Sequence, residues 1–224
     1  MVGSARRDRI TAGLRQPTPD IGWSKEHNAE LFGAEGRYEE AVGILERVIP
    51  VIDRSELDQA IGELYDLAEQ RGPTVHWKQR ALSAYLQSVQ QGEVHYYHHL
   101  VDYYTDVAEN RGEAVKWAYK DLQLRENFAT QAALGWAFYP DGRLSDAVHW
   151  IERALASGVV DALLYFRPGE IYGAAGKEIE GRSLRERALS LNPTVAGFHV
   201  HHREVTKPGS HLQPSRRPYR RHWR

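Results

Sequence analysis

The sequence predicts an all-α fold built from stacked pairs of short helices. Apolar residues recur at three- and four-residue steps in segments such as 38–50, 55–70 and 145–158, which is the period of a helix. No comparable alternating run favours strands. Glycines and prolines separate these segments at intervals that suit helix ends and tight turns. Helices of about 12–15 residues with such short connections predict antiparallel pairs.

A repeat of 34 residues supports this fold class. The stretch 133–161 aligns with 167–193 so that four pairs of matching residues are each 34 positions apart. These pairs are Gly135 and Gly169, Phe138 and Tyr172, Gly142 and Gly176, and Ala154 and Ala188. Small residues let paired helices approach closely, and the aromatic residues fill the space between neighbouring pairs. No single pair can bury its apolar face alone, so we expect several pairs to stack.

This pattern resembles the tetratricopeptide repeat (TPR), a helix–turn–helix unit. In that family a Leu-Gly pair and an aromatic residue lie on the first helix, a Gly lies near the turn, and small residues lie on the second helix. Gly181 departs from the pattern, because the family has a small Ala there. The resemblance is to a bacterial-type TPR-containing protein, and it implies a right-handed superhelical solenoid of about five repeats. The matching residues of one unit are Leu134, Gly135, Phe138, Gly142, Ala147 and Ala154, and the next unit ends at Pro193.

Five units follow one another along the chain in this register, and the last two match the motif best. Residues 1–21 are expected to be a flexible N-terminal segment, and residues 206–224 a disordered basic tail. Residues 194–205 are expected to form a short closing helix, with Phe198 and Val200 covering the fifth unit. The TPR domain, 22–205, comprises that helix and units at about 22–54, 55–93, 94–127, 128–161 and 162–193.

Composition excludes several kinds of protein. The chain has 224 residues and no Cys, which excludes disulfides, thiolate zinc sites and Cys nucleophiles. It has no apolar run of the roughly 18 residues that a membrane helix needs, and its N-terminus lacks the apolar core of a secretory signal. We therefore expect a cytoplasmic protein without membrane partners.

The net charge of −1 is a sum over unlike segments. Residues 207–224 contain six Lys or Arg and no acid, and residues 1–21 contain four Arg against two Asp. The body between them is therefore strongly acidic.

The resemblance implies a concave groove lined by the first helix of each unit. Acids and aromatic residues at those positions suit a basic or amphipathic peptide with apolar anchors. The alternative for Trp136 is a place in the core. Some TPR domains bind C-terminal carboxylates through Lys, Asn and Arg, but the corresponding positions here hold Glu26, Glu30, Gln59, Glu63, His98 and Asp102. The predicted groove residues are Glu63, His95, His98, Asp102, Trp136, Tyr139, Phe166 and Glu170.

Two histidine clusters offer an alternative site for a metal ion. His95, His98, His99 and Asp102 fall on one side of a helix, where imidazoles and a carboxylate can share Zn²⁺. The opposing interpretation is that they are groove or surface residues. A second cluster, His199, His201 and His202 with His211, is subject to the same two interpretations. No resident cofactor is expected.

These features predict a non-catalytic protein–protein interaction module or adaptor. The sequence has no nucleophile elbow, phosphate-binding loop, dinucleotide-binding glycine motif or His-Glu-x-x-His. Two alternatives stay open: a metal-binding TPR protein, and a self-assembling scaffold whose basic tail meets the acidic groove of another copy. A homo-oligomer is therefore one outcome. Nucleic acid is the less favoured partner, although Tyr219 and Trp223 lie between arginines of the tail.

Overall fold

The computed structural model describes residues 19–52 and 54–198. Within these ranges the chain is all-α, with no strand, which confirms the predicted fold class. The N-terminal segment 1–18 and the tail 206–224 lie outside the described residues, while helix α1 already begins at Pro19. The elements are α1 (Pro19–Ala34), α2 (Tyr38–Val48), α3 (Ser55–Leu67), α4 (Arg71–Gln90), α5 (Tyr96–Asp102), the π-helix η1 (Tyr103–Val107), α6 (Arg111–Leu124), α7 (Phe128–Phe138), α8 (Leu144–Leu155), α9 (Ala162–Ala174) and α10 (Glu178–Leu191).

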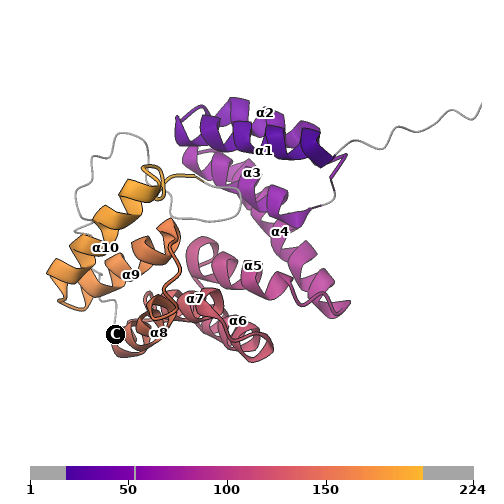
Figure 1. Cartoon of the computed structure of the whole chain (residues 1–224). Helices are drawn as coiled ribbons and strands as arrows, with labels where there is room; N and C mark the ends of the chain where they lie inside the picture. The colour runs from indigo at the N-terminus through magenta and orange to yellow at the C-terminus, as the bar shows by residue number, and fades with distance from the viewer. Residues whose placement is uncertain (1–18, 53, 199–224) are drawn as a thin grey trace, which may run out of the picture.

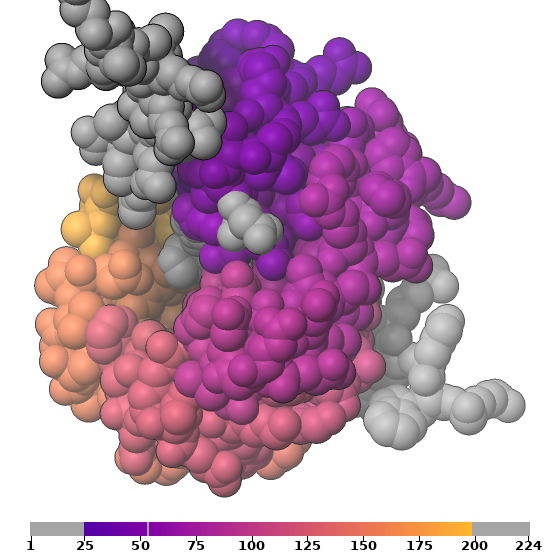
Figure 2. Space-filling view, turned by 90° about the vertical axis from the view of Figure 1, so that its right-hand side faces the viewer, coloured from indigo at the N-terminus to yellow at the C-terminus, as the bar shows by residue number. Residues whose placement is uncertain are grey.

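Consecutive helices pack as five antiparallel hairpins. The pairs are α1 with α2, α3 with α4, α5 with α6, α7 with α8, and α9 with α10. The hairpins follow an arc in which the first helix of each pair lies on the inner side (Figure 1). The chain after α10 runs from the last hairpin toward the N-terminal helices (Figure 1), and the space-filling view shows these two ends of the arc on the same side of the molecule (Figure 2). None of the described helices is long and apolar enough to cross a membrane.

The hairpin turns explain why some units match the repeat motif better than others. Each turn contains one residue with a positive φ angle, a conformation that glycine adopts without steric cost. In the first, fourth and fifth hairpins that residue is Gly36, Gly142 or Gly176, with φ of 80°, 77° and 81°. In the second and third it is Glu69 or Glu109, with φ of 60° and 49°. The middle units therefore use the same turn without the glycine that marks it in the sequence.

Close contact between paired helices fixes the positions of small residues. A Cβ added to Gly135 on α7 would lie 2.7 Å from Ile151 Cγ2 on α8. In the last hairpin the backbones of α9 and α10 approach more closely: a Cβ on Gly181 would lie 2.7 Å from the carbonyl oxygen of Gly169, whereas the nearest backbone atom to a Cβ on Gly135 is the carbonyl oxygen of Ala147 at 3.1 Å. The departure at Gly181 from the expected alanine therefore has a steric cause.

The described part of the expected closing helix 194–205 is not helical, and residues 199–205 lie outside the described residues. Its described part, 194–198, forms turns, with the Asn192 side chain accepting hydrogen bonds from the backbone N–H and the hydroxyl of Thr194. Val195 and Ala196 pack in one apolar cluster with Phe166 of α9. Val200 lies outside the described residues.

Phe198 does not cover the fifth unit as expected. It is 2% exposed and belongs to the apolar cluster of the first three helices, where its ring packs against Gly33 of α1 and Leu64 of α3. We call residues 194–198 the strap. The strap connects the last hairpin to the first two, which is the connection visible after α10 in Figure 1.

Candidate functional site

The inner side of the arc is acidic. We define the inner face as the first-helix residues that the repeat register directs toward it. Among the described residues, the first helices from α3 to α9 contain a single Lys or Arg, which is Arg167. The ionisable and aromatic members of the inner face are Glu26, Glu30, Glu56, Glu63, Asp66, His95, His98, Asp102, Asp106, Trp136, Tyr139, Phe166 and Glu170.

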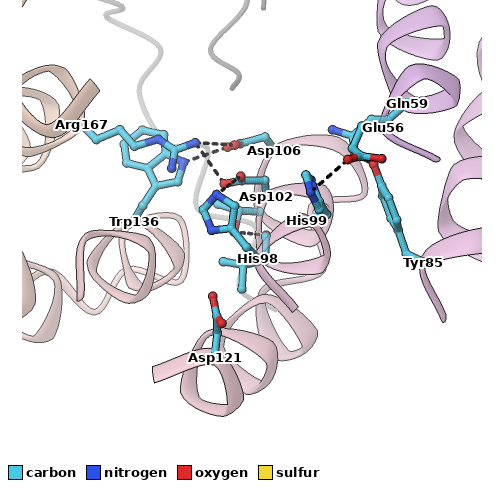
Figure 3. A network of polar contacts seen from close by, with 12 residues as sticks. Glu56, Gln59, Tyr85, His98, His99, Asp102, Asp106, Asp121, Trp136 and Arg167 are labelled. Atoms are coloured by element: carbon cyan, nitrogen blue, oxygen red, sulfur yellow. Dashed lines mark hydrogen bonds and ion pairs between the residues drawn. The ribbon is translucent and has the colours of Figure 1, made fainter. Parts of the chain in front are cut away.

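A buried ionic network connects three successive first helices (Figure 3). Arg167 on α9 donates from Nη2 to Asp102 Oδ1 at 3.2 Å and to Asp106 Oδ2 at 3.4 Å. Its guanidinium lies 5.2 Å from the ring of Trp136 on α7, and Trp136 Nε1 donates to Asp106 Oδ1 at 2.9 Å. Arg167, Asp102 and Trp136 are each no more than 5% exposed. A planar guanidinium suits such a site, because it can bond two carboxylates and stack on a ring at once.

The π-helix η1 supplies one of these partners. It continues α5 directly and contains Asp106, one turn beyond Asp102. Single π turns within helices recur at functional sites. Asp106 and Arg167 were not predicted as site residues. A signal was present for Arg167, since it is the lone charge in the otherwise apolar run 162–169.

The histidines of α5 point to different partners. His98 Nε2 lies 3.3 Å from Asp102 Oδ2, whereas His99 Nε2 lies 3.6 Å from Glu56 Oε1 on α3 and its ring stacks on Tyr85. His95 packs against Tyr96. Within 19–52 and 54–198 no three His, Asp or Glu side chains are grouped so that they could hold a metal ion. The metal alternative on His95, His98, His99 and Asp102 is therefore unsupported, because these side chains diverge; the cluster at His199, His201, His202 and His211 lies outside the described residues.

A series of side-chain hydrogen bonds runs from the inner face into the core. Tyr85 on α4 donates its hydroxyl to Gln59 Oε1 at 3.0 Å, and Gln59 Nε2 donates to Glu63 Oε1 at 2.8 Å. Burial and the nearby carboxylate of Glu56 raise the pKa of Tyr85 well above its usual range. Tyr85 therefore stays a neutral hydrogen-bond donor, which suits a role in positioning Glu63.

Comparison with known proteins gives a structural likeness alone. No family model matches the sequence, and no curated protein matches it. Among solved structures, PilW, a widely conserved type IV pilus biogenesis factor, matches 77% of this chain and 78% of its own with a TM-score of 0.51 at 12% identity. TPR-like repeats of a putative kinesin light chain from Podosopora anserina match 77% of this chain and 95% of theirs, with a TM-score of 0.46 and 20% identity. MamA from AMB-1 matches 78% and 93%, with a TM-score of 0.38 and 21% identity.

The chain folds as a TPR solenoid. The TPR register assigns its inner face to the position of the expected concave groove, and we call that face the groove. The predicted groove residues divide into two groups there. Glu63, Asp102, Trp136 and Phe166 are buried, and the last of these lies under Val195 and Ala196 of the strap. His95 is exposed, and His98, Tyr139 and Glu170 are partly exposed.

Burial gives Trp136 and Asp102 a supporting role in the TPR groove. They hold the first helices of the third, fourth and fifth units in register, as described above. Groove residues with accessible surface lie on either side of the buried network of Arg167, Asp102 and Trp136. At the N-terminal end these are the partly exposed Glu30 and Glu56 and the exposed Asp66. They lie on α1 and α3, which sequence reasoning had weighted less than α7 and α9.

The carboxyl of Glu170 on α9 is affected by burial and by one nearby cation. Burial raises its pKa above the ordinary value, and the guanidinium of Arg185, 3.5 Å away, opposes part of that shift.

Cations outside the first helices meet several of the other groove acids. Arg54 lies 3.1 Å from Glu26 and 3.8 Å from Glu56, and Lys78 of α4 lies 2.8 Å from Asp66. The described residues of the inner face still contain more acids than Lys or Arg, with histidines and a tyrosine between the carboxylates.

Proposed function

We propose that this TPR solenoid is a non-catalytic interaction module that binds a basic or amphipathic peptide segment of a protein partner in its concave groove. Solenoids of stacked helix pairs use their curved inner surface for binding. The observation that carries the proposal is the excess of acids on that surface. Asp66 is exposed there and pairs with Lys78, Glu30 is partly exposed, and the Glu56 side chain is 12% exposed. Lys and Arg are absent from the described part of α3, α5 and η1.

Both components of the proposed ligand have a counterpart in the groove. Lys and Arg side chains would face the acids of α1 and α3, where attraction accelerates encounter and selects against acidic partners. An apolar anchor would face the partly exposed Tyr139 and the aromatic cluster around it, in which Tyr139 and Trp136 are 5.3 Å apart. An acidic C-terminal peptide is disfavoured, because the cationic clamp positions hold Glu26, Glu30, Gln59, Glu63, His98 and Asp102.

Binding of two synthetic peptides tests this proposal. One is an amphipathic peptide of Leu and Lys, and the other has each Lys replaced by Glu; both are labelled and titrated with the full chain by fluorescence anisotropy. We expect the basic peptide to bind at least tenfold more tightly than the acidic one, and its affinity to fall as salt is added. Equal affinities, or a preference for the acidic peptide, would refute the proposal.

Paired variants locate the binding surface. Glu30→Gln with Asp66→Asn removes two accessible charges from the groove, and Glu178→Gln with Glu186→Gln removes two exposed charges from α10. We expect the first pair to weaken the basic peptide several-fold and the second to leave it within twofold. A larger effect from the α10 pair would place binding elsewhere. The self-assembling scaffold and the cytoplasmic location stay predictions.

A further inference from the structure

The same chain contains a basic segment whose charge suits the acidic groove. The described chain ends at Phe198, which is buried between α1 and α3, the helices that carry the partly exposed Glu30 and the exposed Asp66. Residues 199–224 begin at that point. They contain seven Lys or Arg, Arg203, Lys207, Arg216, Arg217, Arg220, Arg221 and Arg224, and one acid, Glu204. The charge of this segment is therefore opposite to that of the surface from which it starts.

We infer that the basic segment 199–224 binds in cis along the acidic concave groove and must be displaced by the partner peptide. The inference deepens the proposed function and rests on it. Its first support is the anchor. Phe198 fills the space over Gly33, where an added Cβ would lie 2.4 Å from the ring, so this contact holds the start of the segment at the groove.

The second support is reach. Twenty-six residues can extend to about 90 Å, whereas five first helices at a spacing of about 10 Å cover roughly 40 Å. The segment can therefore pass every acid of the groove from α1 to α9. Prolines at 208, 214 and 218 disfavour a continuous helix over its length.

The third support is tethering. Because Phe198 fixes one end, the segment meets the groove at an effective concentration that short flexible linkers bring into the millimolar range. Individual contacts between Arg and accessible carboxylates are weak. Several of them on a tethered chain are sufficient to compete with a free peptide. A partner must then bind the groove tightly enough to displace the basic residues that follow Phe198.

Paramagnetic relaxation measures this contact directly. The chain has no Cys, so Ser215→Cys carries a nitroxide at a single place in the segment. We expect amide signals of α1, α3 and α5 to broaden, while those of α2 and α10 do not. Arg216, Arg217, Arg220 and Arg221 changed together to Gln should abolish the broadening. Arg6, Arg7, Arg9 and Arg15 changed to Gln remove the same charge from the other end and should leave it intact.

Two results of this experiment would overturn the inference. Broadening that is absent, or equal on inner and outer helices, would show that the segment does not dock. Broadening that appears only when the nitroxide is on a second, isotopically unlabelled copy would assign the contact to another molecule. The measurement needs no added peptide, so it separates failure of this inference from failure of the proposed function.

A competition experiment measures the consequence of docking. The labelled probe is a free peptide of residues 199–224, titrated into the full chain and into the two Arg-to-Gln variants. We expect the variant with four C-terminal Arg changed to Gln to bind the probe at least tenfold more tightly than the unchanged chain, because its groove is free for a larger fraction of the time. The N-terminal variant should match the unchanged chain. Equal affinity in all three would refute cis occupancy.

Discussion

Arg167 and Asp102 are 65 residues apart in the sequence, and their side chains meet 3.2 Å apart beneath the concave face. The pair connects α9 to α5 across α7, which separates them. Both side chains are at least 93% buried, so the pair has little water to screen it. The contact therefore joins the fifth unit directly to the third.

Removing the arginine of this pair should be strongly destabilising. Arg167→Met leaves Asp102 and Asp106 with an uncompensated buried charge, which costs about 3–5 kcal/mol. Arg153 on α8 pairs with Glu126 at the surface, and Arg153→Met should cost less than about 1 kcal/mol. Urea unfolding of the two variants measures the difference. Equal losses would show that the buried network contributes no more than a surface ion pair.

Restoring the expected TPR residue at position 181 should weaken the last hairpin. Gly181→Ala places a methyl group 2.7 Å from the carbonyl oxygen of Gly169, so α9 and α10 must separate at a cost of about 1–3 kcal/mol. Gly72 lies in the first turn of α4 with nothing within 4 Å of an added Cβ. Gly72→Ala should therefore be neutral or stabilising. Thermal unfolding distinguishes the two, and a gain for Gly181→Ala would contradict the steric account.

Sequence reasoning reached the parts of the fold that depend on local patterns. The match of Gly135 with Gly169 expresses the close contact of two adjacent helices, which recurs at every unit. The strap and the pair of Arg167 with Asp102 depend on the curvature of the whole array, and no local pattern encodes that. For the same reason the sequence left two places open for Trp136, the groove and the core. The repeat register places it at the groove, and in the folded chain it is buried.

The middle units offer a test of the turn geometry. Glu109 adopts a φ of 49°, where a side chain costs about 1 kcal/mol relative to glycine. Glu109→Gly should therefore raise the free energy of unfolding by up to that amount. Glu93 is an exposed residue outside the positive-φ set, and Glu93→Gly should lower the free energy of unfolding by about 0.5–1 kcal/mol. Loss of stability in both variants would contradict the geometry.

Stability should depend on pH through Glu170. Burial raises the pKa of this carboxyl in the folded chain. The folded chain therefore holds more protons than the unfolded chain just above the ordinary pKa of Glu, and its stability falls as the pH rises through that window. Glu170→Gln removes this fall, so the variant should gain stability relative to the unchanged chain as the pH rises from about 4 to about 7. A difference that stays constant or decreases would contradict the assignment.

Glu152 supplies a control of opposite sign for the same measurement. A hydrogen bond from Lys177 lowers the pKa of Glu152 below its ordinary value. Its stabilising contribution is present above that ordinary value and is lost as the pH falls through the lowered one. Glu152→Gln should therefore differ in its pH dependence only on the acid side of the ordinary Glu pKa, and only slightly, since the pair is exposed.

The central claim is that the concave groove of this TPR solenoid binds basic peptides, and chemical-shift mapping tests it most directly. The isotopically labelled full chain is titrated with the Leu-Lys peptide at low salt. The account predicts that the largest shifts cluster on α1, α3 and α5, around Glu30, Glu56 and Asp66, and that they vanish for the peptide with Glu in place of Lys. Shifts that cluster on the outer helices α2, α4 or α10 would contradict it.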